Sequence, residues 1–261
     1  MTTKLLNREP ALDNIRQFGL FDDFQSFNTG DDWTSLAASA TVAASDTLNG
    51  NLVITTAGAD NDEGAVYSTK QLFKMYNNLP LVVVARAQID SPSQAYGAAM
   101  SIGLMDGIAT DFIVDNDGGP AAGKHLCAFH MASGTGNGRN LGVYSVSSAA
   151  GTYQATSTEI TISDSDWNSY MITVEPISTT EKRISFFFDA DGGQNWKKLK
   201  DSNGNVITHK WTLSDPAAGT GEMNLYAGCK STSAEAQVMN IDYLGAWQLR
   251  KSYPATGVST D

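Results

Sequence analysis

After residue 50 the sequence alternates between apolar and polar residues with a period of two, and no helical pattern of useful length appears there. A period of two places every second side chain on the same face of a β-strand. Tyr170, Ile172 and Val174 form one apolar row of this kind, and alternate residues of 184–188 form another. Because burial of each such side chain contributes roughly 1.5–3 kcal/mol to folding, these rows predict an all-β protein.

Short clusters of Gly, Ser, Asn, Asp and Thr separate the expected strands, without a long linker. We predict strands at 51–56, 64–69, 80–90, 97–105, 110–115, 124–131, 140–146, 158–163, 168–176, 182–189, 195–200, 206–211, 222–229 and 236–250. One inward row is expected in the last strand from Met239, Ile241, Tyr243, Trp247 and Leu249. Many short strands joined by short loops favour one β-sandwich domain. We place it at residues 21–250, between an extended N-terminal arm at 1–20 and a C-terminal tail at 251–261.

The charge of the chain limits its partners. There are 28 acidic and 17 basic residues, which give a formal net charge of −11. Binding to nucleic acid or to an anionic membrane needs a basic face, so neither partner is expected. The longest apolar run, near residues 79–87, is too short to span a bilayer. The first ten residues hold no apolar leader, so we expect folding in a cytoplasm. Cys127 and Cys229 are expected as buried reduced thiols, with a disulfide as the alternative.

A turn rich in Asp and Gly follows an aromatic run and precedes a Trp, which predicts a β-hairpin. Gly192 and Gly193 adopt positive φ without a Cβ penalty, and Asp189 and Asp191 can accept hydrogen bonds from N–H groups of the turn. Trp196 is then positioned to fold its ring over the turn. The segment resembles the Asp-box hairpin of sialidases, with Asp189 in place of the usual hydroxyl residue. A single copy argues against a sialidase, so we predict that these five residues form a structural staple.

The first 20 residues differ from the rest because they are slightly basic and carry apolar side chains without a second element to pack on. One interpretation is a frayed terminus. The other is an arm that becomes ordered on a neighbouring subunit. The residues assigned to this docking role are Leu5, Leu6, Arg8, Ile15, Arg16 and Phe18.

Four segments together resemble the concanavalin A-like lectin/glucanase superfamily, whose fold is a two-sheet antiparallel jelly roll. They are Phe21-Asp-Asp-Phe24 with Trp33 nine residues on, Leu52-Val-Ile-Thr55, the hairpin, and the closing segment 238–249. The resemblance covers about residues 21–250. A fold of this kind serves glycosidases, lectins and structural modules, so the function has to come from the site.

The glucanases of this superfamily carry a Glu-x-Asp-x-x-Glu strand, and retaining chemistry needs two carboxyl groups ~5 Å apart. The sequence holds no such spacing, so hydrolysis is the least favoured function, and no catalytic residue or cofactor is assigned. Calcium stays an open alternative, because Asp115-Asn-Asp117-Gly118 and Asp189-Ala-Asp191-Gly192 begin like calcium loops, although self-capped turns explain the same residues.

The three histidines predict no metal site. His125 and His130 lie five apart in one expected strand and therefore face opposite ways. His209 and Trp211 are expected as a surface pair on another strand.

The remaining features describe an acidic β-sandwich without catalytic motifs, preceded by an arm that contains apolar residues. This combination resembles accessory virion proteins of tailed bacteriophages, so we expect a non-enzymatic capsid decoration (cement) protein. The resemblance implies a major capsid protein or another virion protein as partner, a homo-oligomer such as a trimer, and assembly in the host cytoplasm. The alternative is a carbohydrate-binding module of a tail fibre or receptor-binding apparatus. Its candidate stacking platforms are Trp33, Tyr96, Tyr144, Tyr153 and Trp167, for each of which core packing is the competing interpretation.

Overall fold

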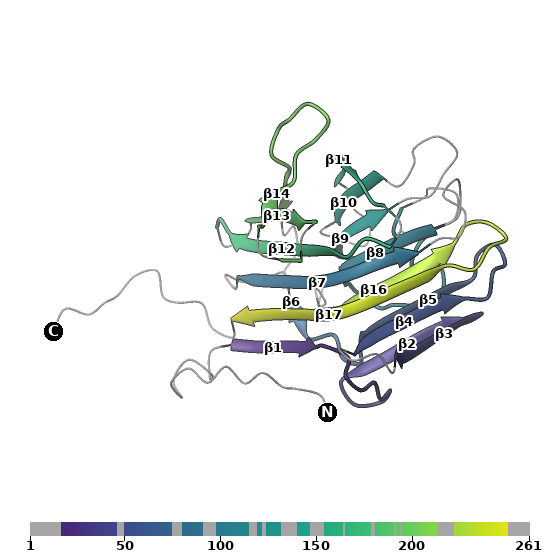
Figure 1. Ribbon diagram of the computed structural model, residues 1–261. Coiled ribbons are helices and arrows are strands. Elements are labelled where there is room, and N and C mark those ends of the chain that lie inside the picture. The colour runs from purple at the N-terminus through teal and green to yellow at the C-terminus, as the bar shows by residue number, and fades with distance from the viewer. Residues whose placement is uncertain are drawn as a thin grey trace.

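The computed structural model shows two antiparallel β-sheets packed face to face (Figure 1). It describes residues 17–45, 50–74, 80–90, 98–114, 119–121, 124–131, 140–146, 154–163, 165–178, 181–190, 192–193, 195–212 and 222–249. These ranges hold 17 strands and no helix, which confirms the predicted all-β sandwich. Within them, no helix is long and apolar enough to cross a membrane.

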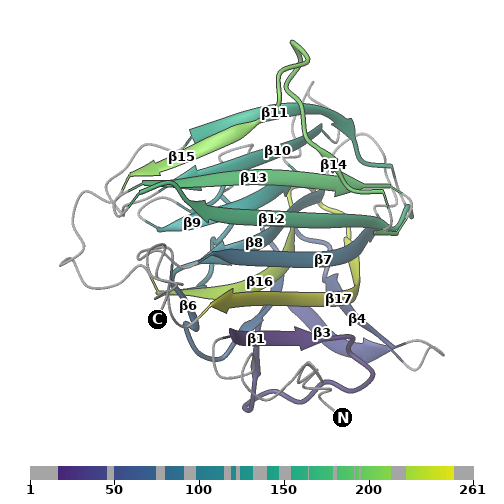
Figure 2. The ribbon, with the colours of Figure 1, turned by 90° about the vertical axis from the view of Figure 1, so that its left-hand side faces the viewer.

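The first layer, sheet A, contains nine of the described strands. Its order is β14 (Lys197–Lys198), β13 (Glu181–Asp189), β12 (Asn168–Pro176), β7 (Leu81–Asp90), β17 (Val238–Leu249), β4 (Asn51–Thr56) and β3 (Ala40–Ser45). In addition, β1 (Gln17–Asp22) pairs with β17, and β15 (Thr208–Thr212) pairs with β13. Figure 2 shows sheet A in front, with the first and last strands of the chain side by side.

The second layer, sheet B, contains eight of the described strands. Its order is β11 (Gln154–Thr161), β10 (Asn140–Val146), β9 (Leu126–Met131), β8 (Ala98–Met105), β16 (Glu222–Ser231), β5 (Glu63–Ser68) and β2 (Trp33–Ala38), and β6 (Phe73–Lys74) pairs with β16. β16 is buried along almost its whole length, because its odd-numbered residues from Met223 to Cys229 belong to the core between the sheets and Tyr226 belongs to a second core on the other face.

The main core lies between the two sheets. In β7 the odd-numbered residues from Leu81 to Ile89 are buried, whereas the even-numbered ones are half-buried on the outer face, apart from the exposed Asp90 at the end of the strand. The predicted rows of β12 and β13 are also buried here, and Phe129 of sheet B packs edge-on against Tyr170 and Phe186. Both cysteines are buried and free, as expected from the sequence, and burial raises the pKa of each thiol to about 12.

A second, smaller core covers the face of sheet B that points away from sheet A. Phe112 and Ile113 come from the segment after β8 and pack on Ala65, Ala128 and Tyr226 of the sheet. This segment corrects the strand predicted at 110–115, because within its described part, residues 110–114, only Ile113 forms an isolated bridge, with Pro120. The apolar residues there serve a covering loop, which the same short pattern describes equally well.

The N-terminal half of the sandwich contains strands that the sequence did not predict, namely β1, β2, β3 and β6. β1 also corrects the boundary of the expected arm, because residues 17–20 pair with β17 and belong to the sandwich. Of the six docking residues assigned to the arm, only Phe18 falls in the described part, where its backbone is opposite Gln248. The other five, and the expected tail at 251–261, lie outside the described residues.

β17 contains a bulge, and after the bulge the odd-numbered side chains no longer face the core. The register with β7 shifts between Ile241 and Tyr243. Met239 and Ile241 are buried as predicted, but after the bulge Leu244 and Ala246 occupy the core. One extra residue moves each following side chain to the opposite face. The predicted inward position of Tyr243 and Trp247 is therefore wrong: both are half-buried on the outer face of sheet A.

Candidate functional site

Three aromatic rings lie next to one another on the outer face of sheet A. The ring centroid of Phe21 in β1 lies 5.7 Å from that of Tyr243 and 5.9 Å from that of Trp247. The interplanar angles are 27° and 24°, so the three rings are nearly parallel. All three are half-buried. We call Phe21, Tyr243 and Trp247 the aromatic row.

Two glycines allow the aromatic row to lie against the sheet. Gly19 is opposite Trp247, and a Cβ added there would be 2.5 Å from Trp247 Cδ1. Gly245 is opposite Phe21, and its added Cβ would be 2.6 Å from Phe21 Cδ2. Each ring thus occupies the space above a glycine on the neighbouring strand. Aromatic side chains cover cross-strand glycines in this way because a larger residue would push the ring off the backbone.

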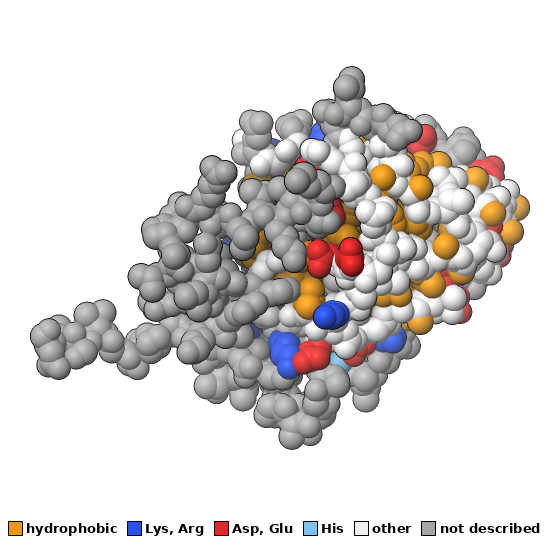
Figure 3. Space-filling view, turned by 90° about the horizontal axis from the view of Figure 1, so that it is seen from below, with side chains coloured by type: hydrophobic (Ala, Val, Ile, Leu, Met, Phe, Trp, Pro, Cys, Tyr) orange, Lys and Arg blue, Asp and Glu red, His pale blue; other side chains and the backbone are white. Residues whose placement is uncertain are grey.

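The apolar surface continues from the aromatic row across sheet A. The register places Gly245 beside Val84, Val84 beside Met171, and Met171 beside Phe187. The side chains of Val84, Met171 and Phe187 are half-buried on the outer face. Figure 3 views the molecule from the side where β1 to β3 lie in Figure 1, and small hydrophobic groups (orange) reach the described surface there between acidic and basic ones.

A polar group adjoins the Tyr243 end of the aromatic row. Arg86 is opposite Tyr243 in the sheet, and its Nη1 donates to Asp242 Oδ2 at 2.8 Å. The guanidinium carbon of Arg86 lies 5.0 Å from the centre of the Trp167 ring, a cation–π distance. The Nε atom of Arg86 is buried and has no hydrogen-bond acceptor among the described residues. The site therefore places a charged hydrogen-bond donor and a carboxylate beside flat apolar rings.

The hairpin between β13 and β14 borders this polar group. The Asp189 Oδ2 atom accepts hydrogen bonds from the backbone N–H groups of Gly193 at 2.7 Å and Asn195 at 2.8 Å. Gly192 and Gly193 have φ of 98° and 93°. A Cβ added at Gly193 would be 3.2 Å from the Tyr243 hydroxyl and 3.6 Å from the Trp196 ring. The turn thus lies between Trp196 and the end of the aromatic row.

The hairpin geometry limits how much the predicted staple contributes. Trp196 is half-buried rather than enclosed, so its loss should destabilise the fold by less than that of a core Trp. Asp191 lies outside the described residues, and its predicted hydrogen bonds stay a prediction.

Of the five aromatic residues predicted as stacking platforms, the structure describes three, and one of these lies at the site on the outer face of sheet A. Trp33 is 2% exposed, and its Nε1–H donates to Asp22 at 2.8 Å, so it belongs to the core and cannot stack on a ligand. Tyr144 is half-buried on sheet B, with its ring 5.1 Å from that of His130. Trp167 is the predicted platform that lies at the site, through its contact with Arg86. Tyr96 and Tyr153 lie outside the described residues.

The described residues contain no group of three or more His, Cys, Asp or Glu side chains arranged to hold a metal ion. Residues 115–118, the first segment that resembles a calcium loop, lie outside the described part. In the second segment, Asp189 caps the hairpin turn. Calcium binding therefore stays an untested alternative.

His130 and His209 both lie in the interior of the protein. His209 is buried, which corrects the predicted surface pair with Trp211: its Nδ1 is 2.8 Å from Ser145 Oγ, its Nε2 is 3.0 Å from Thr156 Oγ1, and Trp211 is buried too. His130 is also buried. Burial lowers the pKa of both His130 and His209 to about 4, so both rings are neutral at pH 7.

Buried charges on sheet B hold the covering loop. The Lys230 Nζ atom lies 2.9 Å from Asp111 Oδ1, 3.0 Å from the Ile113 carbonyl and 3.9 Å from Glu63 Oε2. Glu63 also accepts a hydrogen bond from the Asp111 backbone N–H. Lys230 and Glu63 are fully buried, whereas the Asp111 side chain is 74% exposed. This cluster ties the loop to the sheet, and we assign it a structural role.

Comparison with solved structures finds the same fold in lectins and in a glucanase. Peanut lectin in complex with a 9-residue peptide has a TM-score of 0.56 and 11% identity, with 91% of this chain and 100% of that chain covered. The exoplasmic/lumenal domain of VIP36, in its form bound to Ca²⁺ and Man3GlcNAc, has a TM-score of 0.52, 12% identity and 86% coverage of both chains. An endo-1,3-β-glucanase from Streptomyces sioyaensis has a TM-score of 0.54 and 14% identity, with 90% of this chain and 98% of that chain covered.

These likenesses confirm the predicted two-sheet antiparallel jelly roll, and at such identities they concern the fold alone. No protein-family model matches the sequence, and no curated protein matches it at a significant level.

The sequence reasoning missed Phe21, Tyr243 and Trp247 as a joint surface. Two signals point to them in retrospect: Gly19 and Gly245 are isolated glycines inside strands, a pattern that indicates a bulge or a close approach by another group. The pairing of β1 with β17, which brings Phe21 between the other two rings, joins segments more than 200 residues apart and has no local signal.

Proposed function

We propose that the protein is a non-enzymatic glycan-binding module and that the aromatic row holds the sugar rings. The observation that carries the proposal is the set of nearly parallel, half-buried rings of Phe21, Tyr243 and Trp247 on the outer face of sheet A. A pyranose ring presents C–H groups on its faces and hydroxyl groups at its edge. Flat aromatic rings complement the faces, and polar side chains beside them complement the hydroxyls.

The polar group at the Tyr243 end supplies those hydrogen bonds. Arg86 and Asp242 are each about one-quarter to one-third exposed, with side-chain values of 30% and 25%. Arg86 carries donors beyond the one that it gives to Asp242, and Asp242 has lone pairs beyond the one that it uses. The lectin fold is consistent with this reading, since VIP36 was solved with Man3GlcNAc bound.

The absence of catalysis is part of the proposal. Two carboxylates adjoin the aromatic row, those of Asp242 and Asp189. Asp242 is paired with Arg86, and Asp189 accepts two backbone hydrogen bonds. Both carboxylates are therefore already engaged in structural contacts, and we assign neither of them a catalytic role. We therefore expect no reducing ends to be released from any bound polysaccharide.

Affinity gel electrophoresis tests the proposal with a panel of β-1,3-glucan, mannan, galactan and bacterial exopolysaccharides in the gel. We expect at least one polysaccharide to retard the wild-type protein. Trp247→Ala should weaken that binding about tenfold, because loss of a stacking ring costs roughly 1.4 kcal/mol. Tyr67→Ala is the matched control, since Tyr67 is a half-buried aromatic residue on sheet B.

Three results would contradict the proposal. The first is that no polysaccharide of the panel retards the wild-type protein. The second is that Trp247→Ala is retarded as much as the wild-type protein. The third is that Trp247→Ala changes the oligomeric state in size-exclusion chromatography without any glycan effect, which would make the row a subunit interface.

The capsid decoration role, with its virion partner and homo-oligomer, stays a prediction, as does assembly in a host cytoplasm. The structural likenesses do not bear on a place in a virion. Because β1 begins at Gln17, a deletion that tests the arm should end at residue 16 and leave the sandwich whole. Loss of incorporation into particles by a folded deletion variant would support the role, and normal incorporation would reject the arm as the attachment site.

A further inference from the structure

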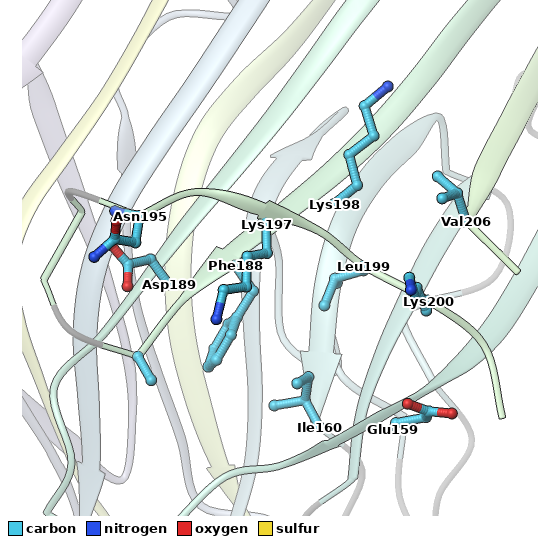
Figure 4. A pocket seen from close by; sticks show the side chains of 11 residues that line it. Glu159, Ile160, Phe188, Asp189, Asn195, Lys197, Lys198, Leu199, Lys200 and Val206 are labelled. Carbon is cyan, nitrogen blue, oxygen red and sulfur yellow. The ribbon is translucent and has the colours of Figure 1, made fainter. Parts of the chain in front are cut away.

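A cavity of about 600 Å³ opens at the edge of the sandwich where β14 of sheet A approaches β11 of sheet B (Figure 4). The hairpin between β13 and β14 lines this cavity and also adjoins the aromatic row. Asp189 and Asn195 line the cavity, while Gly193, two residues before Asn195, adjoins the Tyr243 hydroxyl. A chain of sugars on the row would therefore end close to the cavity.

The inner wall of the cavity is apolar. Phe188 and Leu199 belong to the main core and are 8% and 3% exposed. Ile160 of β11 packs against that core from the other sheet. Figure 4 shows Leu199 and Ile160 pointing into the space that Phe188 borders. Such a wall suits the C–H face of one sugar ring.

One ammonium group points into the cavity. Lys197 is opposite Phe188 in the sheet, so both side chains project on the same face, and Figure 4 shows Lys197 directed toward Phe188. Lys198 also lines the cavity, but it is opposite Phe187 and Figure 4 shows its side chain directed away from Phe188, with its Nζ 5.7 Å from the centre of the Phe187 ring. Both lysines are exposed. Among the described residues, no carboxylate forms an ion pair with Lys197. In a chain with a net charge of −11, this is a local site for an anion.

The opposite wall can bind hydroxyl groups. Glu159 of β11 lines the cavity across from β14, and Asn195 and Lys200 add polar groups at the rim. The cavity thus combines an apolar wall, one inward cation and a separate hydrogen-bond acceptor.

We propose that this cavity binds the carboxylate-bearing sugar of an acidic glycan, with Lys197 as the residue that selects the carboxylate. The choice of a sugar rests on the proposed glycan binding. The simpler interpretation of Lys197 is that an inward-facing charge on a short edge strand prevents pairing with other sheets. Under that interpretation Lys197 has no effect on the binding of a small ligand. A binding experiment can therefore distinguish carboxylate recognition from protection of the edge strand.

NMR titration of the full chain with sodium glucuronate and with glucose tests the proposal. We expect glucuronate to bind the wild-type protein about fivefold more tightly than glucose, the factor that corresponds to roughly 1 kcal/mol for a partly exposed ion pair. Lys197→Met should remove this preference. Lys198→Met is the matched control, because it removes the adjacent charge that points away, and it should retain the preference.

Equal binding of glucuronate and glucose by the wild-type protein would overturn the inference, as would an equal loss in Lys197→Met and Lys198→Met. Acetate that binds as tightly as glucuronate would also overturn it, because the cavity would then hold any small anion. Failure here is distinct from failure of the proposed function. If the cavity proposal fails, the wild-type protein shows no glucuronate preference, but polysaccharide retardation still depends on Trp247. If the proposed function of the aromatic row fails, the glucuronate preference remains.

Discussion

Gly19 and Trp247 are opposite each other in β1 and β17, and the Trp247 indole covers the position where a side chain at residue 19 would begin. The ring can lie flat on the sheet because residue 19 has no Cβ. The glycine in one terminal strand therefore sets the orientation of an aromatic ring in the other.

Gly19→Ala therefore tests the orientation of Trp247 in a variant that keeps all three aromatic residues of the row. The new methyl group would be 2.5 Å from Trp247 Cδ1, so the ring has to lift off the sheet. We expect glycan binding to weaken by about fivefold, as a stacking interaction of roughly 1 kcal/mol is lost, with a small decrease in melting temperature. Gly142→Ala is the control, since its methyl group would press on Tyr144 of sheet B. Unchanged binding by Gly19→Ala would mean that the orientation of Trp247 does not matter.

The Asp189 hairpin should contribute measurably to stability. Replacing the buried Asp189 by Ala leaves the N–H groups of Gly193 and Asn195 without their acceptor, at a cost of about 1–3 kcal/mol. Urea denaturation measures the change, and faster hydrogen exchange of these two amides would locate it. Asp201→Ala is the matched control, because Asp201 is less buried than Asp189 and also accepts hydrogen bonds from two backbone N–H groups, those of Asn203 and Asn205. If both variants unfold at the same urea concentration, burial of the Asp189 bonds has no special effect.

Two buried histidines should make stability depend on pH. Burial lowers the pKa of His130 and His209 from 6.5 to about 4 in the folded protein. Between these values the unfolded chain binds protons that the folded protein does not, so stability falls as the pH decreases. Two protons give a limiting slope of about 2.7 kcal/mol per pH unit. The raised pKa of buried Asp22 acts in the opposite direction.

Urea denaturation at about pH 7, 5.5 and 4.5 measures this slope, and His209→Gln should reduce it by roughly half. Stability that stays constant or rises on acidification would show that the two rings are protonated in the folded protein.

The charge cluster of sheet B predicts strong coupling between two residues. Lys230→Met removes the ammonium group near the buried Glu63 carboxylate and should destabilise the fold by about 3–5 kcal/mol. Adding Glu63→Gln removes the buried negative charge as well, so the double variant should be more stable than Lys230→Met alone. Chemical denaturation of both single variants and the double variant gives the coupling energy. Additive effects would mean that the two side chains do not interact.

The sequence predicted most of the sheet but only part of the surface. Strands with regular alternation, such as 51–56, 140–146 and 168–176, have the predicted bounds. The strands at 33–38 and 40–45 were missed because their small and polar residues, rich in Ala, Ser and Thr, give little apolar contrast. The predicted strand at 110–115 failed because a covering loop on a second core also needs apolar residues.

The candidate site depended on a feature that periodicity cannot detect. Extrapolating the period from Met239 through Tyr243 to Trp247 assumed an uninterrupted strand, and the bulge at Ile241 broke it. A bulge depends on the partner strand, so its position is a tertiary property. The hairpin was recognised because its Asp and Gly residues lie within a few positions of each other in the sequence. The aromatic row, in contrast, combines residues from the first and the last described strand.

The most direct test of glycan binding at the aromatic row follows the indole N–H signals of the five Trp residues during NMR titration with an oligosaccharide of the retarding polysaccharide. We expect the Trp247 signal to shift in proportion to saturation. The signals of Trp33 and Trp211, which are 2% and 1% exposed, should stay in place. A saturating oligosaccharide that leaves the Trp247 signal unmoved would show that the aromatic row does not bind the glycan.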